Sequence, residues 1–173
     1  MAAAHAPVEI ELIPHFRDLP PAIEDGVTFE ENAVKKAMHY APYASGPIFA
    51  DDSGLEVDAL GGAPGVYSAR FSGPEATDES NNRLLLDRLR GIDNRTARFV
   101  CAIALVDGGR VRGLYHGAVE GRILDGPRGT SGFGYDPLFY YEPFGCTFGE
   151  ATDEQKFSAS HRGQALRAML QSL

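Results

Sequence analysis

Glycine is concentrated in two stretches of this chain, and its distribution constrains the fold more than any other sequence feature. Five glycines lie between Gly54 and Gly73, and nine lie between Gly108 and Gly134. Glycine permits sharp turns and close approaches that residues with a Cβ atom resist. Both stretches are therefore expected to carry turns or ligand-contacting loops, and the Gly108-Gly109 pair is typical of a hairpin.

Segments with strand and helix patterns alternate unevenly around these glycines. Alternation predicts a half-buried strand over residues 8–13, and apolar runs predict strands over 48–50, 55–60, 97–106, 110–116, 118–124 and 138–141. Helices are expected near Phe29, where Thr28 and Glu31 have capping-box spacing, over residues 78–90, and from Ser160. The length of 173 residues predicts a single domain covering residues 1–173. The alternation of strands and helices predicts a mixed α/β fold.

Charge is also concentrated, within a formal total of −8. Eight acids and two lysines lie between Glu24 and Asp58, whereas no acid follows Gln155, where Lys156 and Arg162 lie. A uniformly basic surface for nucleic acid is therefore not expected. One acidic and one cationic region suit a bound metal and a polyphosphate, and a solvated acidic face beside an ordinary basic helix is the alternative.

The chain shows no pattern typical of export or membrane insertion. Residues 1–12 lack the basic and apolar regions of a signal peptide, and the longest apolar run, 99–106, is far shorter than the roughly 20 residues of a membrane helix. Cys101 and Cys146 lack the spacing of a disulfide framework or a zinc site, and Cys101 is expected in the core. A soluble, cytoplasmic protein without a membrane partner is expected.

The first candidate site is the pair of acids at positions 51 and 52, which serine and glycine follow. We expect the pair to end a buried strand, where ligands gather in α/β folds, with a turn over residues 53 and 54. Neighbouring side chains of a strand point to opposite faces, and the position next to the turn favours Asp52 as the acid that faces the site. Asp52 with Glu24 or Glu31 would suit Mg²⁺, whereas the alternative is that both acids only cap the turn.

The second candidate is the glycine-rich loop over residues 126–136. Its glycines are expected to free N–H groups for an anion or a base edge, and Phe133 and Tyr135 offer rings for stacking. A solvent-exposed loop that closes a hairpin is the alternative.

The third candidate combines Lys156 with Ser160, His161 and Arg162 at the expected start of the last helix. A helix N-terminus attracts anions, Arg offers a fork for phosphate and Lys a point charge. Cations at this end oppose the helix dipole, which favours a functional role over a purely structural one. His161 suits either anion binding or base recognition.

Four segments of the chain closely resemble the inosine triphosphate pyrophosphatase family. They are TFEENAVKKA (28–37), ADDSGLEVDALGGAPGVYSARF (50–71), GFGYDP (132–137) and SHRG (160–163). The resemblance implies an α/β fold with a long central mixed β-sheet, flanking helices and two lobes separated by a cleft. It also implies a homodimer and Mg²⁺-dependent hydrolysis of ITP, dITP and XTP to the monophosphate and pyrophosphate.

The resemblance also implies a role for each matching position. Asp52 matches the catalytic acid, which is a metal ligand and proton acceptor. Glu24 matches the second Mg²⁺ ligand, whereas the residues alone did not distinguish Glu24 from Glu31. The positions that match substrate contacts are Ser53, Phe133, Gly134, Tyr135, Asp136, Lys156, His161 and Arg162.

The chain departs from the family pattern at three places, the first of which is Gly149 and Ala151, where the family has an Ala and a Leu. Phe157 stands where the family commonly has Asn, and the family's first strand with its Thr-Gly-Asn-x-x-Lys phosphate loop is not found ahead of Lys35, the first lysine. Residues 8–13 resemble the family's second strand instead. A second hypothesis is therefore a catalytically impaired nucleotide-binding or dimerisation module, and a third assigns modified pyrimidine or standard nucleotides as substrates.

Overall fold

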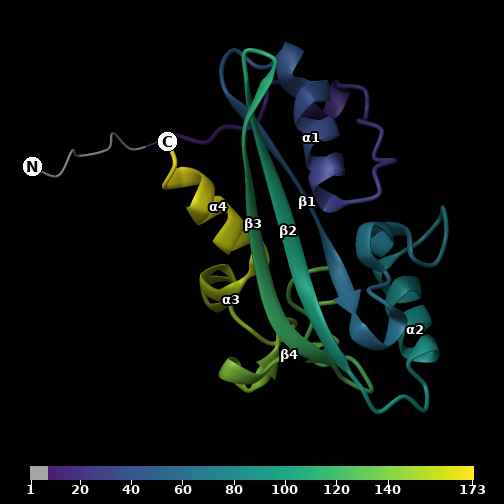
Figure 1. Cartoon of the computed structure of the whole chain (residues 1–173). Coiled ribbons are helices and arrows are strands. Elements are labelled where there is room, and N and C mark those ends of the chain that lie inside the picture. The colour runs from purple at the N-terminus through teal and green to yellow at the C-terminus, as the bar shows by residue number, and fades with distance from the viewer. Residues whose placement is uncertain (1–7) are drawn as a thin grey trace, which may run out of the picture.

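A long, open five-stranded sheet forms the centre of the computed structural model, which describes residues 8–173 (Figure 1). The strands lie in the order in which they follow one another along the chain. They are β1 (Ile48–Val57), β2 (Thr96–Asp107), β3 (Arg110–Ile123), β4 (Phe139–Tyr141) and β5 (Cys146–Thr147). All pairings between them are antiparallel.

Helices flank this sheet. They are α1 (Phe29–Tyr40), α2 (Asp78–Arg88), α3 (Asp153–Ala159) and α4 (His161–Leu170), with short 3₁₀ helices over Phe16–Asp18, Ala41–Tyr43, Asp58–Leu60, Gly65–Arg70 and Glu142–Phe144. The Thr28 hydroxyl accepts a hydrogen bond from the N–H of Glu31, which confirms the predicted start of α1. None of the described helices is long and apolar enough to cross a membrane.

Helices α1 and α4 cover opposite faces of the sheet. Ala33 and Ala37 of α1 pack with Ala102 and Ala104 of β2. On the other face, α4 packs against a cluster that contains Cys101, whose predicted place in the core is confirmed. A third apolar cluster at the far end of the sheet joins α2 to β4 and the loops around it. The α/β class and the long central sheet with flanking helices are confirmed.

The predicted hairpin at Gly108-Gly109 is also confirmed. Gly108 and Gly109 have φ angles of 57° and 72° and connect β2 directly to β3. Two residues with positive φ form the turn that matches the twist of antiparallel strands. Such tight connections join neighbours antiparallel, and the described sheet contains no parallel pair, so the expectation of a mixed sheet is wrong for these strands.

The predicted strand over residues 8–13 is wrong. These residues pair with no strand in the described chain, and Val8, Ile10 and Leu12 are 53%, 48% and 74% exposed. Alternating apolar residues become a half-buried strand only where a neighbouring strand completes the backbone hydrogen bonds.

Two predicted breaks within strands are also wrong, because glycine serves close packing there and not a turn. β1 runs without interruption through residues 51–54, and a Cβ on Gly54 would lie 2.5 Å from Ser68 Oγ. β3 runs through Gly117, where a Cβ would lie 2.0 Å from the carbonyl oxygen of His161 at the start of α4. Asp51 and Asp52 therefore lie in the middle of a strand and neither end it nor cap a turn.

Candidate active site

A cavity of about 390 Å³ beside β1 brings together all of the predicted substrate-contacting residues. Its lining comes from β1, the 3₁₀ helix over residues 65–70, α2, the loop over residues 133–136, α3 and α4. All eight predicted contacts line it: Ser53, Phe133, Gly134, Tyr135, Asp136, Lys156, His161 and Arg162. Ser53 and Arg162, which are 109 residues apart in the sequence, thus meet at one site.

Arg162, in the first turn of α4, joins that helix to β1. Its Nε donates to Asp51 Oδ2 at 2.9 Å, and its Nη2 donates to Ser53 Oγ at 2.9 Å. Asp51 and Ser53 lie on the same face of the strand because they are two residues apart. Asp51 therefore neutralises and orients the guanidinium, a role that sequence reasoning missed.

Lys156, in α3, forms an ion pair with Asp136, which is only 3% exposed. The same carboxylate accepts the N–H of Phe133 at 2.9 Å. The Phe133 ring is 62% exposed, and its centroid lies 4.8 Å from Lys156 Nζ and 5.7 Å from Arg162 Cζ. An exposed aromatic face with two cations beside it can stack on a planar base.

His161 is buried and stacks on Phe99, with ring centroids 5.0 Å apart and planes inclined by 14°. Burial, and then the positive charges of Arg162 and Lys156, lower the pKa of His161 from 6.5 to about 3. Its ring is therefore neutral at physiological pH. The buried Nδ1 atom has no hydrogen-bond partner in the described chain.

One expectation for the glycine-rich loop is wrong, and a second is wrong at Gly134. Tyr135 is 4% exposed and its hydroxyl donates to the carbonyl of Ser68 at 2.7 Å, so its ring belongs to the core and offers no stacking face. The N–H groups of Phe133 and Gly134 are not free for an anion, because carboxylates of Asp136 and Asp78 already accept them.

The two predicted metal ligands lie toward the other face of β1. Lys36 of α1 joins Glu24 to the backbone of β1, because its Nζ lies 3.2 Å from Glu24 Oε2 and donates to the carbonyl of Asp51 at 3.0 Å. Asn32, one turn earlier on the same helix face, is 1% exposed and accepts the N–H of Gly26 at 2.8 Å. Sequence reasoning did not assign Asn32 and Lys36, although their spacing of four residues on a helix facing an acid strand was available as a signal.

Burial raises the pKa of Asp52 above its ordinary value, and the nearby charge of Glu24 acts in the same direction. A hydrogen bond from Asn32 and the charge of Lys36 oppose this shift. Asp52 Oδ2 is buried and has no hydrogen-bond partner among the described residues. A buried carboxylate oxygen in this state is suited to hold a cation or to accept a proton.

The carboxylates of Glu24 and Asp52 suit Mg²⁺ better than they suit a metal whose ligands all come from the protein. The described residues contain no group of three or more His, Cys, Asp or Glu that could hold a metal ion. Mg²⁺ commonly binds one or two carboxylates and completes its shell with water and substrate phosphates. Glu24 and Asp52 are the two carboxylates that could serve as that pair.

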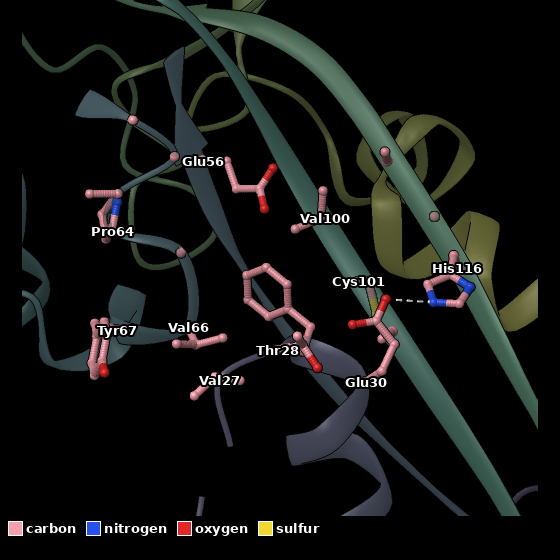
Figure 2. Close-up of a pocket in the computed structure, with 18 of the residues that line it drawn as sticks. Val27, Thr28, Glu30, Glu56, Pro64, Val66, Tyr67, Val100, Cys101 and His116 are labelled. Atoms are coloured by element: carbon pink, nitrogen blue, oxygen red, sulfur yellow. Dashed lines mark hydrogen bonds and ion pairs between the residues drawn. The ribbon is translucent and has the colours of Figure 1, made fainter. Parts of the chain in front are cut away.

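A larger cavity of about 780 Å³ lies on the sheet face where α1 begins, and it does not contain the predicted site (Figure 2). Glu30 and His116 line it and are hydrogen-bonded, with Oε1 of Glu30 2.8 Å from Nε2 of His116. Glu56 lies farther along its wall. Its lining includes no lysine or arginine. The smaller cavity contains Lys156 and Arg162, so it is better suited than the larger one to an anionic ligand.

The model of the Ham1 family matches residues 1–172. The chain belongs to the Ham1 family. The match confirms the resemblance noted in the sequence. It spans the segments that form both faces of the site around β1.

Curated relatives of this Ham1-family chain carry the name dITP/XTP pyrophosphatase. The relative from Syntrophobacter fumaroxidans is 51% identical over 94% of this chain and 70% of its own length. The relative from an Exiguobacterium strain is 52% identical over 93% of this chain and 82% of its own length.

Solved structures of the family have the same architecture. The Ham1 protein of Staphylococcus aureus is 41% identical, with a TM-score of 0.83 over 89% of this chain and 80% of that one. The HAM1 protein of Coxiella burnetii is 43% identical, with a TM-score of 0.82 over 88% of this chain and 79% of that one.

Proposed function

We propose that this chain hydrolyses non-standard purine nucleoside triphosphates, namely ITP, dITP and XTP, to the monophosphate and pyrophosphate. One observation carries the proposal above the others. Lys156 and Arg162 meet a neutral histidine and an exposed phenylalanine ring in one cavity. Asp52, which precedes the cavity residue Ser53 and faces the other side of β1, has a buried carboxylate oxygen with no hydrogen-bond partner among the described residues. The names of the relatives favour the same activity.

The cavity's chemistry favours a purine with an oxo group at C6. Lys and Arg side chains donate hydrogen bonds and accept none. A C6 oxygen would accept from Lys156 or Arg162 while the base stacks on Phe133. The C6 amine of adenine would place a donor against these donors, which disfavours ATP.

Glu24 and Asp52 would hold Mg²⁺ on the other face of β1, at the edge of the described sheet. When bound, Mg²⁺ offsets the charge of the phosphate oxygens and makes the attacked phosphorus more electrophilic. Lys36, 3.2 Å from Glu24, holds that carboxylate in place and adds a positive charge for the departing pyrophosphate.

Asp52 would act as the general base. Water attacks the α-phosphorus, its oxygen bonds to that atom, and the bond from the α-phosphorus to the bridging oxygen of the β-phosphate breaks. The proton of the attacking water passes to the carboxylate of Asp52. The electron pair of the broken bond leaves with pyrophosphate.

Pyrophosphate release from ITP in the presence of Mg²⁺ tests this function. We expect turnover by the unmodified chain and a loss of about 10²–10⁴-fold in kcat for Asp52→Asn, the usual contribution of a general base. Asp58→Asn is the matched control, because Asp58 pairs with Arg98 at 3.0 Å, away from both faces of the site. Absence of turnover by the unmodified chain would reject the function, and an active Asp52→Asn would reject the role of Asp52.

The other two hypotheses are less favoured. An impaired binding module is disfavoured because relatives named as pyrophosphatases match 94% and 93% of this chain. A substrate panel distinguishes the pyrimidine alternative, since faster turnover of dUTP or dTTP than of ITP would support it.

We also propose that the protein is a cytoplasmic homodimer. Val27 and Tyr67 are 77% and 57% exposed at the rim of the larger cavity, and both are apolar surfaces that a second copy would cover (Figure 2). Sedimentation of the purified chain tests the dimer, with Val27→Asp expected to shift it toward the monomer. Cell fractionation tests the compartment.

A further inference from the structure

Gly134, in the loop that carries Phe133, is held on both sides of its backbone by α2. Asp78 Oδ2 accepts the Gly134 N–H at 2.8 Å, and Asn82 Nδ2 donates to the Gly134 carbonyl at 3.0 Å. Asp78 and Asn82 are four residues apart and therefore lie on one face of α2. They are 56 and 52 residues from Gly134 in the sequence, so this contact is a product of the fold.

The held glycine is next to the exposed ring of the site. Phe133 follows Gly132, whose φ is 75°, and precedes Gly134, whose φ is 61°. A segment between two glycines has many backbone conformations open to it. The cations of Lys156 and Arg162 lie over the ring, and the Phe133 N–H is bound by Asp136. The two hydrogen bonds from α2 therefore hold the backbone of the residue that follows the ring.

Asp78 and Asn82, the clamp on Gly134, belong to a helix that is itself held firmly. Leu85 and Leu89, which follow on α2 and in its C-terminal turn, are fully buried in the apolar cluster. Asn81 donates to the carbonyls of Ser68 and Ala69 at 3.3 and 3.2 Å, so the first turns of α2 are tied to the cavity wall.

We propose that Asp78 and Asn82 are positioning residues, which hold the loop through Gly134 so that the Phe133 ring is ready to stack on the base. Without them, the loop samples other conformations and only a fraction of molecules presents the ring. The apparent affinity for the nucleotide then falls by that fraction, while the chemical step is unchanged in the molecules that bind. The expected effect on nucleotide affinity rests on the proposed function, whereas the effect on the position of the loop does not.

The mobility of residue 133 gives a test that needs no activity. The chain contains no tryptophan, so Phe133→Trp introduces a single fluorophore at the ring position. We expect the fluorescence anisotropy of this reporter to fall when Asp78→Ala and Asn82→Ala are added. Glu79→Ala is the matched control, because Glu79 is an acid of the same helical turn that pairs only with Arg83 on the surface, at 2.7 Å. Equal anisotropy in the clamp and control variants would overturn the proposal.

The kinetic test uses the chain with Phe133 intact. We expect the double variant Asp78→Ala/Asn82→Ala to raise KM for ITP by about 3- to 10-fold, with kcat changed less. Asp78→Asn retains an acceptor oxygen and should keep KM near that of the unmodified chain. A fall in kcat at unchanged KM, or no rescue by Asp78→Asn, would contradict positioning.

The outcomes separate this inference from the proposed function. If anisotropy falls in the clamp variants but no variant turns over ITP, the clamp is supported and the function is wrong. If the unmodified chain turns over ITP and the anisotropy is insensitive to the clamp, the function stands and the clamp is wrong. Should the double variant not fold, Asn82→Asp alone decides, because it removes the donor at unchanged size and is expected to lower the anisotropy.

Discussion

Replacing His161 with Gln should remove a defined part of the protein's acid sensitivity. His161 is buried against Phe99, and its pKa falls from 6.5 to about 3 on folding. Because the folded state resists protonation, the unfolded state binds more protons between these two values. The stability that depends on neutral His161 is therefore complete above pH 6.5 and is lost progressively as the pH falls toward 3.

The size of the effect follows from the difference between the two pKa values. A pH of 5 lies about 1.5 units below the pKa of His161 in the unfolded chain, where the residue is therefore almost fully protonated. The free energy of unfolding should drop by about 2 kcal/mol relative to pH 8. For a chain of this length that is roughly 4–8 °C in Tm. His161→Gln cannot titrate, and it should lack this part of the pH dependence, even if lost stacking lowers its stability at every pH.

Urea unfolding at pH 8 and pH 5, at one fixed protein concentration, measures the effect. The compared quantity is the change in unfolding free energy between the two pH values, which cancels the constant packing cost. His15→Gln is the control, because the His15 side chain is 85% exposed. The reasoning is refuted if His161→Gln loses as much stability on acidification as the unmodified chain does.

Three further changes have defined expectations. Gly54→Ala should destabilise the fold by about 1–3 kcal/mol in urea unfolding, because its Cβ would lie 2.5 Å from Ser68 Oγ and 2.6 Å from the Gly65 carbonyl oxygen. Gly46→Ala, with nothing within 4 Å, is the control, and equal loss in both would contradict the packing account. Glu24→Gln should raise the Mg²⁺ concentration for half-maximal activity on the order of tenfold, about 1.4 kcal/mol, and an unchanged Mg²⁺ titration would remove Glu24 from the metal site. Arg162→Lys keeps the charge but loses the fork that reaches Asp51 and Ser53, so KM for ITP should rise about tenfold, whereas Arg167→Lys on the same helix should not change it.

Local signals predicted the elements whose stability is local. The start of α1 follows from a threonine hydroxyl and an N–H three residues later, and the β2–β3 hairpin from two glycines with positive φ. Neither depends on distant parts of the chain. These features could therefore be predicted from spacing alone.

Features that depend on a distant neighbour could not be predicted in this way. Gly54 and Gly117 are typical of breaks in a strand, yet each admits another backbone segment against a continuous strand. The ring of Tyr135 lies in a loop pattern suited to stacking, yet its hydroxyl is bound by Ser68, 67 residues away. The same limit hid the roles of Asp51 and Lys36, whose partners come from other elements.

The position of the bond that breaks tests the central claim most directly. The chain is incubated with ITP and Mg²⁺ in water enriched in ¹⁸O, and the products are resolved by phosphorus NMR and mass spectrometry. Attack at the α-phosphorus predicts IMP that carries one ¹⁸O atom, together with unlabelled pyrophosphate. Release of IDP with labelled inorganic phosphate, or label in pyrophosphate, would contradict the account.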